Sequence, residues 1–540
     1  MTITQREPVH LKATALLVLT VVFSCVPQFA SSTEPPTQKT QETPLSVAER
    51  DLGFAGGYFS AGDHSKALAL LAPAIDLVRR EGPKGEPLLA TLLNARGMVF
   101  SAQNELESAE VDFREALEIH RRVRGNSATT LQSALALARL LDRKRDSQPA
   151  LSAYQQAFGL AAQLSPGDDS LAADAGNELG LYLHRLGKHR EADPVFRRVL
   201  KLRKSAEKVN RVKLAEAQNN LATNEAALGR LDVAETLYRE ALAIYRLQEG
   251  DQSENVARSI SNMGFILDKM GQYHKAETQH REALRIRLAI LPPNHPDLAT
   301  SYSNLASNLS DLGRSAEAEP FLRLALAINI KNFGENGVET TRNMSNLAVI
   351  LRAQKKYSEA AALLTRAFRA ASSAQGPNHP ETLVIAGNLA VALGSANKHS
   401  EAEPLLRRIL AERTRSLGAS HPDVATTTNN LASNLRAQGK LTAALALFQS
   451  ATDRTIPQFG PDHPLSIAFD GNVAYTSQLL SRHADALSHY RGIAVAIIDR
   501  VDLLADNARE NEEAANGGYF RYAVSNAFAL ASSQILRASQ

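Results

Sequence analysis

The chain has 540 residues, in which 60 lysines and arginines and 57 aspartates and glutamates give a formal net charge of +3. Positive and negative side chains are interspersed along the whole length, so no basic stripe is available to neutralise many phosphates, and nucleic acid is not expected as a partner. Hydrophobic residues make up 44% and aromatic residues 5%, with no tryptophan, which favours helices rich in alanine and leucine over a β-sandwich.

Residues 1–32 have the pattern of a secretory signal peptide. Arg6 and Lys12 precede an apolar run over residues 13–24, and small residues follow up to Ser32. The run is shorter than the roughly 20 apolar residues that span a bilayer, so cleavage is expected in place of a permanent anchor. We therefore expect an exported chain, periplasmic or secreted, with no transmembrane span after maturation.

Two interpretations of the only cysteine, Cys25, stay open. Cleavage after Ser32 would discard Cys25 with the signal, whereas lipidation of Cys25 would give a membrane-attached lipoprotein. In both cases the mature chain has no disulfide and no cysteine nucleophile. The residues that follow, 33–45, are rich in Pro, Thr, Gln and Glu and are predicted to form a flexible linker.

A repeat with a 42-residue period occupies residues 46–505 and is marked by two ladders of small residues. The first ladder is Ala67, Ala109, Ala150, Ala192, Ala234, Ala276, Ala318, Ala360, Ala402, Ala444 and Ala486, with a single interval of 41. The second ladder stands seven residues later, at Ala74, Ala116, Ala157, Val199, Ala241, Ala283, Ala325, Ala367, Ile409, Ala451 and Ile493. Larger residues such as Phe113, Tyr238 and Leu322 lie between them. Offsets of four and seven residues share one face of an α-helix.

A second amphipathic helix precedes each ladder helix. It contains segments such as residues 303–306 and 429–432, and it ends at a glycine such as Gly187, Gly313 or Gly439, which can adopt the left-handed conformation of a tight turn. Small residues at the contacts allow helices to approach to about 8–10 Å. Each repeat is therefore predicted to be a helical hairpin, and the fold to be all-α with about eleven antiparallel hairpins.

The order Asn-Leu-(Ala or Gly), Leu, Gly, Ala, (Phe, Tyr or Leu), Ala resembles the tetratricopeptide repeat, whose usual period is 34 residues. The longer period and the connectors at residues 293–297, 376–381, 418–423 and 460–464 resemble the kinesin-light-chain class of that repeat, in a bacterial exported form. The resemblance implies a right-handed superhelical solenoid. Residues 506–540 keep a helical pattern without the ladders and are predicted to be a C-terminal capping segment.

Catalytic, metal and cofactor sites are not expected. The connector histidines His295, His379, His421 and His463 stand one repeat apart, too far apart to share a metal ion, and each lies beside a helix-starting position. A phosphate loop, a dinucleotide-binding motif, a zinc-protease motif and a nucleophile elbow are all absent from the sequence. We therefore predict that the chain is not an enzyme.

Asparagines stand fourteen residues before seven successive first-ladder alanines, at Asn220, Asn262, Asn304, Asn346, Asn388, Asn430 and Asn472. The resemblance implies that they face the inner wall, where an amide can bind the backbone of a peptide ligand whatever its side chains. An equally weighted alternative is that these amides bind the adjacent helix or water and only orient the repeats.

Four arginines are predicted to lie beside the asparagines on the inner face: Arg258, Arg342, Arg352 and Arg436. Arginine binds carboxylates through paired hydrogen bonds, and the resemblance implies short acidic ligands, so an extended acidic peptide is the expected ligand. The alternative is that these arginines are merely solvated.

The sequence thus predicts an exported scaffold or adaptor that binds a protein or peptide partner in its groove. Two further hypotheses are a structural or self-associating component of the cell envelope, and a sensor or regulatory subunit of an enzyme encoded elsewhere. The fold by itself does not identify the partner.

Overall fold

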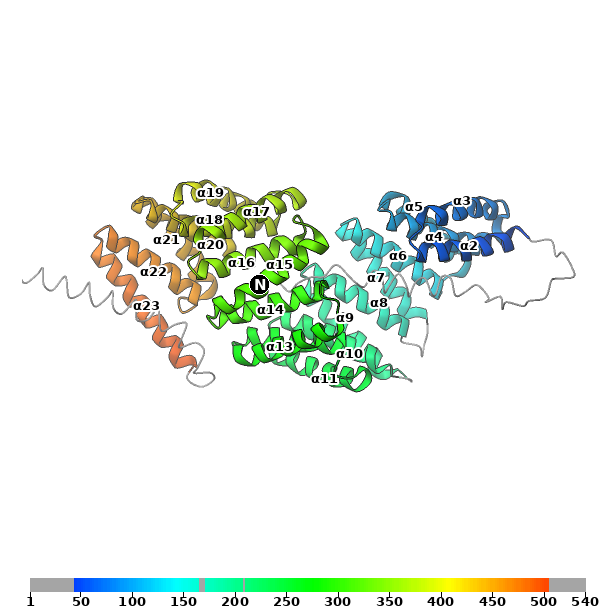
Figure 1. Cartoon of the computed structure of the whole chain (residues 1–540), viewed down its shortest axis with the longest axis horizontal. Coiled ribbons are helices and arrows are strands. Elements are labelled where there is room, and N and C mark those ends of the chain that lie inside the picture. The colour runs from blue at the N-terminus through cyan, green and yellow to red at the C-terminus, as the bar shows by residue number, and fades with distance from the viewer. Residues whose placement is uncertain (1–42, 165–169, 207–208, 505–540) are drawn as a thin grey trace, which may run out of the picture. The chain divides into compact units, whose positions relative to one another are not determined.

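The computed structural model describes residues 43–164, 170–206 and 209–504, and this part of the chain contains 22 α-helices, one short 3-10 helix and no strand (Figure 1). The all-α prediction is confirmed. The predicted signal peptide 1–32, including Cys25, lies outside the described residues, as does the predicted capping segment 506–540.

The chain divides after Asp251 into two compact units, each of which is described by itself. Unit 1 contains five hairpins: α2 (Pro44–Ser60) with α3 (His64–Arg80), α4 (Glu86–Ala102) with α5 (Leu106–Arg124), α6 (Ala128–Arg143) with α7 (Ser147–Leu164), α8 (Ser170–Arg185) with α9 (His189–Ser205), and α10 (Arg211–Ala227) with α11 (Leu231–Glu249). The 3-10 helix η1 (Gly82–Lys84) joins the first two of them.

Unit 2 contains six hairpins: α12 (Glu254–Lys269) with α13 (Tyr273–Ile290), α14 (Pro296–Asp311) with α15 (Ser315–Phe333), α16 (Val338–Ala353) with α17 (Tyr357–Gln375), α18 (Pro380–Ser395) with α19 (His399–Leu417), α20 (Pro422–Ala437) with α21 (Leu441–Phe459), and α22 (Pro464–Leu479) with α23 (His483–Leu504). The two units together hold the eleven predicted hairpins.

The predicted linker 33–45 overlaps the first helix by two residues. Helix α2 begins at Pro44, and the Thr43 hydroxyl caps it by accepting a hydrogen bond from the backbone N–H of Ser46 at 3.2 Å. Proline suits the first helical turn because its missing N–H has no partner there. The threonine cap and the proline therefore start the helix inside a stretch that composition alone predicted to be linker.

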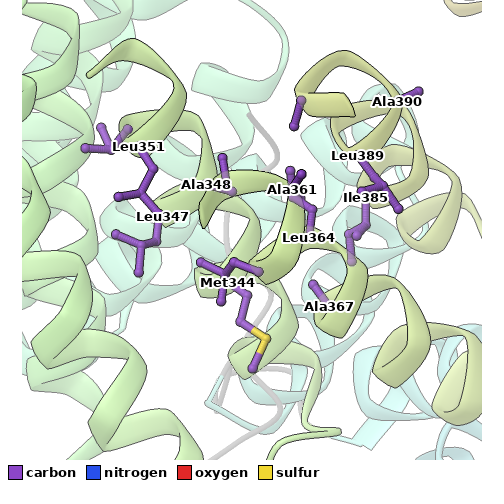
Figure 2. Close-up of a cluster of buried hydrophobic side chains, with 14 of the residues drawn as sticks. Met344, Leu347, Ala348, Leu351, Ala361, Leu364, Ala367, Ile385, Leu389 and Ala390 are labelled. Carbon is purple, nitrogen blue, oxygen red and sulfur yellow. The ribbon is translucent and has the colours of Figure 1, made fainter. Parts of the chain in front are cut away.

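Both ladders of small residues line the buried contacts between helices. All eleven alanines of the first ladder are 0% exposed, and no residue of the second ladder is more than 4% exposed. In unit 2 the apolar core runs through successive hairpins and includes Met344 and Leu347 of α16, Leu364 of α17 and Leu389 of α18 (Figure 2). The ladder prediction is confirmed.

Inside each hairpin, a small residue of the first helix faces the larger residue that lies between the two ladders. Gly264 of α12 faces the His280 ring, and a Cβ atom at Gly264 would lie 2.7 Å from that ring. His280 is 2% exposed and occupies the slot of Leu322 and Phe448 in other hairpins, where the facing residue is alanine. His280 is not among the larger residues predicted between the two ladders, although it stands four residues after Ala276, as those residues do after their own ladder alanines.

The turn inside each hairpin needs one left-handed residue. Gly313 has φ +75° between α14 and α15, as predicted, but Lys355 holds the same position between α16 and α17 with φ 63°. A left-handed conformation costs a residue with a side chain about 1–2 kcal/mol. The turn geometry is thus imposed by hairpin packing even where glycine is missing.

The connector histidines are helix N-caps. His421 Nδ1 accepts a hydrogen bond from the backbone N–H of Asp423 at 3.2 Å, and His295, His379 and His463 make the same contact at 3.2, 3.3 and 3.1 Å. An N-cap acceptor satisfies an N–H that the helix itself leaves unpaired. The prediction of a helix-start motif is confirmed. In the described part of the chain, no group of three or more His, Cys, Asp or Glu side chains could hold a metal ion.

Candidate binding groove

The first helix of each hairpin, here called the A helix, lines the inner side of each unit. In unit 2, α12, α14, α16, α18 and α20 each contact the next A helix, the last of them α22, whereas no comparable contact joins successive second helices, here called B helices. When hairpins in a stack lie closer together on one side than on the other, the stack curves, and the closer side becomes the concave one. The A helices therefore form the wall of a groove, and the B helices face outward.

Four of the predicted asparagines hold neighbouring A helices together. Asn388 Nδ2 donates to Ser345 Oγ at 2.9 Å, and Asn304 Nδ2 donates to Ser261 Oγ at 3.1 Å. Asn220 and Asn472 likewise donate to Asn177 and Asn429 at 2.7 and 3.0 Å. The acceptor always lies 43 residues earlier, one period plus one residue, so these amides do orient the repeats. A role of the same amides in ligand binding stays a prediction.

Asn346 and Asn430 depart from this pattern, and in the described structure neither side chain has a hydrogen-bond partner. For Asn430 the position 43 residues earlier is Gly387, which has no side chain. For Asn346 that position is Ser303, whose hydroxyl donates to the Ala299 carbonyl at 2.8 Å and also contacts Asn343 Oδ1 at 3.1 Å. Both amides are half-buried and keep a donor and an acceptor available. The remaining asparagine, Asn262, lies half-buried on α12.

Arg342 is already paired with carboxylates of the protein. Its Nε lies 3.2 Å from Glu381 Oε1, and its NH1 lies 2.8 Å from Glu339 Oε2. Burial opposes the charged guanidinium, but the hydrogen bond to Glu381 and the charge of Glu339 outweigh it and raise the pKa of Arg342. Arg342 thus links α16 to α18, and a ligand carboxylate would have to compete with both partners.

The other three predicted arginines differ from one another. Arg436 lies between two rings, 5.0 Å from the Phe448 centroid and 5.1 Å from that of Tyr475, and donates to Asn472 Oδ1 at 3.0 Å. Arg352 is exposed at the end of α16 without a partner in the described structure. Arg258 Nε is shielded from solvent and also lacks a partner. Arg258 and Arg352 are therefore the members of the set that could receive a ligand carboxylate without breaking an ion pair.

The hairpin array with a polar inner wall defines a helical repeat protein. The chain belongs to the tetratricopeptide repeat family: one model described as Tetratricopeptide repeat matches residues 88–163, 213–289, 255–331, 337–415, 402–455 and 423–491, and a second matches residues 172–208, together more than half of the chain. Proteins of this family commonly act as protein-binding scaffolds, and protein partners are expected of this fold. No curated protein matches the chain in sequence.

Three solved structures show how the chain compares with known repeat proteins. BtubC (BKLC) from P. vanneervenii is 26% identical, with 42% of this chain and 92% of that one covered and a TM-score of 0.38. A structure of kinesin light chain nearly identical TPR-like repeats from Podosopora anserina is 22% identical, with 38% and 99% covered and a TM-score of 0.35. The apo quorum sensor NprR from B. thuringiensis is 13% identical, with 70% and 99% covered and a TM-score of 0.51, a likeness of fold alone. The predicted family is confirmed.

Proposed function

We propose that this protein is an exported adaptor that binds an extended segment of a partner protein in the groove formed by the A helices of unit 2. The observation that carries the proposal is the pair of unpartnered amides, Asn346 and Asn430, on a wall whose other amides are occupied. An amide with a free donor and a free acceptor can bind the backbone of a peptide in the way a neighbouring strand would. Backbone recognition tolerates many sequences, as an adaptor requires.

Acidic residues in the partner would meet Arg352 and Arg258. Both guanidinium groups lack a carboxylate partner in the described structure, and Arg352 is exposed. Arginine binds a carboxylate through two parallel hydrogen bonds, which fixes the orientation of the ligand as well as adding affinity. The ligand is therefore an extended and partly acidic segment, and the protein acts by binding it, without catalysis.

A retention experiment on envelope extracts tests this proposal. The full chain is immobilised as wild type, as the triple variant N346A/N430A/R352A, and as a control carrying R369A and Q449A. Arg369 on α17 and Gln449 on α21 are exposed B-helix residues without partners in the described structure, so the control removes similar groups from the outer face. A partner retained by wild type and control and lost from the triple variant supports the proposal. The same proteins retained by all three forms would overturn it.

Export is a separate part of the proposal and rests on residues 1–32. Among the described residues, no helix is both long enough and apolar enough to cross a membrane. Cell fractionation and the intact mass of the mature protein test export: a mature chain that starts at Thr33 supports cleavage, whereas a lipid-modified Cys25 supports the lipoprotein alternative. A full-length chain found in the cytosol would contradict both forms.

Self-association is the second candidate function, and an exposed apolar face of α2 favours it. Phe54 and Tyr58 are 58% and 39% exposed there. Leu305 and Leu347 occupy the position of Phe54 in later hairpins and are 0% and 1% exposed, because a preceding hairpin covers them. Light scattering on wild type and on F54S/Y58S tests this candidate. A dimer that the variant dissociates would support it, and a monomeric wild type would exclude it.

A further inference from the structure

The inner face of α18 differs from the inner faces of its neighbours. Four residues before the ladder asparagine, α14, α16 and α20 carry Thr300, Arg342 and Thr426, whereas α18 carries Val384, which is 48% exposed. Three residues after the asparagine, α14 and α20 carry serine, whereas α16 and α18 carry Val349 and Val391. Val349 is 39% exposed and Val391 is half-buried. We call Val349, Val384 and Val391 the valine patch.

Gly387 lies in the middle of this patch. It stands between Val384 and Val391 on the same face of α18, and a Cβ atom there would meet no heavy atom within 4 Å. The missing side chain leaves the backbone of α18 open to close approach by another chain. It also leaves Asn430 of the next A helix without the acceptor that Ser345 gives Asn388. One glycine therefore both opens the surface and leaves an amide unpaired.

The charged side chains beside Val384 are paired within the protein, and Arg352, one turn after Val349, is the unpaired charge at the edge of the patch. Glu381, one turn before Val384, is bound to Arg342, which also binds Glu339. An acidic or basic ligand group would gain little there, because the local guanidinium and carboxylates are already paired. An aliphatic group would instead remove exposed valine surface from water. The opposite side of α18 contributes Ile385 and Leu389 to the core (Figure 2), so the helix that presents the patch is firmly held.

We infer that the valine patch is a specificity site for a small aliphatic side chain of an extended peptide segment that is uncharged beside Val384, and whose backbone is bound on either side by Asn346 and Asn430. The two amides belong to α16 and α20, the A helices that contact α18 from its two sides. This inference rests on the proposed binding in the groove and adds the chemistry of one ligand position. It places the acidic part of the ligand beyond Val349, at the edge of the patch, toward Arg352 and Arg258.

Selection from random peptides displayed on phage tests the inference. The full-length wild type is the bait, and synthetic copies of the enriched peptides are titrated against four variants: V384D/V391D, G387R, N346A/N430A and the control V495D. Val495 is 57% exposed on the B helix α23, so the control places the same charge on the outer face. We expect the enriched peptides to share an aliphatic residue and to lose at least about tenfold in affinity for V384D/V391D and G387R, but not for V495D.

The outcomes separate this inference from the proposed function. If the peptides lose affinity for N346A/N430A but bind V384D/V391D as well as wild type, groove binding stands and the role of the valine patch is overturned. If no peptide is enriched, or if every variant binds equally, both are overturned. Circular dichroism shows whether each variant is folded. G387S, which adds only a hydroxymethyl group at an open helix position, serves as a second, milder test and is also expected to weaken binding, because its hydroxyl would occupy Asn430.

Discussion

Asn388 donates a hydrogen bond from Nδ2 to Ser345 Oγ at 2.9 Å, and the equivalent bond is missing one hairpin later because Asn430 faces Gly387. At Asn430 the missing side chain of Gly387 thus leaves a ladder amide without the partner that joins two hairpins at Asn388. The groove wall therefore differs along unit 2: Asn388 and Asn472 are hydrogen-bonded to the preceding A helix, whereas Asn430 between them is not.

Gly387→Ser is expected to stabilise unit 2 by about 1–2 kcal/mol. Serine is favoured over glycine in a helix by roughly 0.5 kcal/mol, and a new hydrogen bond to Asn430 adds about 1 kcal/mol. Chemical denaturation followed by circular dichroism measures the change. In an N430A background the hydrogen-bond part should disappear, and an equal gain in both backgrounds would show that the serine does not bind Asn430.

Lys355→Gly is expected to stabilise the α16–α17 turn by about 1 kcal/mol, because glycine adopts the left-handed conformation without the cost that a Cβ atom imposes. Lys355 has φ 63°, close to the φ of Gly313 in the preceding hairpin. The control is Lys355→Ala, which removes the same long side chain but keeps the Cβ atom. Thermal unfolding should separate the two variants, and equal melting temperatures would contradict this account of the turn.

Glu254→Ala is expected to destabilise unit 2 by about 3 kcal/mol, because it leaves a buried guanidinium without its counter-charge. Arg287 is 1% exposed, and its NH2 lies 2.7 Å from Glu254 Oε1. Glu339→Ala is the matched comparison. Arg342 would keep its ion pair with Glu381, and the Arg342 side chain is 30% exposed. We expect that variant to lose less than about 1 kcal/mol. Equal losses in denaturant titrations of the two variants would refute the distinction.

The sequence predicted the hairpins well because their contacts repeat. Ala318 is 0% exposed, as its place in the ladder predicted, since a small residue at every hairpin contact leaves a periodic trace. At His280 the repeat has a histidine where phenylalanine, tyrosine or leucine was expected. The His280 ring packs there because Gly264 of the facing helix has no side chain, a relationship visible only when both helices are compared. Repeat spacing thus determines where a residue lies better than what it touches.

The groove was less predictable from the sequence because its state depends on pairs of residues one period apart. The acceptors Ser261 and Ser345 stand immediately before Asn262 and Asn346, and this signal could have been found by reading the position before each asparagine. The pairing of Arg342 with Glu381 could not have been found in this way, since it depends on which of several nearby carboxylates the Arg342 side chain reaches. Individual side-chain pairing is decided by local packing rather than by periodicity.

Acid is expected to destabilise unit 1 through His120. This imidazole is 2% exposed, and its Nδ1 lies 2.8 Å from Ser133 Oγ. Burial, together with the charge of Arg124, lowers the pKa of His120 to about 4. A histidine in the unfolded chain has a pKa of about 6.5, so between these values the unfolded state binds the proton more readily than the folded state. The stabilisation is therefore complete above about pH 6.5 and is lost as the pH falls toward 4.

At pH 5 this loss amounts to about 2 kcal/mol, since each unit of pKa difference corresponds to about 1.4 kcal/mol. Denaturant unfolding of wild type and of His120→Gln at pH 7 and pH 5 measures it, with hydrogen exchange of the α5 and α6 amides as the local readout. Glutamine keeps a hydrogen-bonding group near Ser133 but does not titrate, so the variant should be less stable than wild type at pH 7 and should lose less on acidification. If both proteins lost the same free energy between the two pH values, proton uptake by His120 would not be the cause.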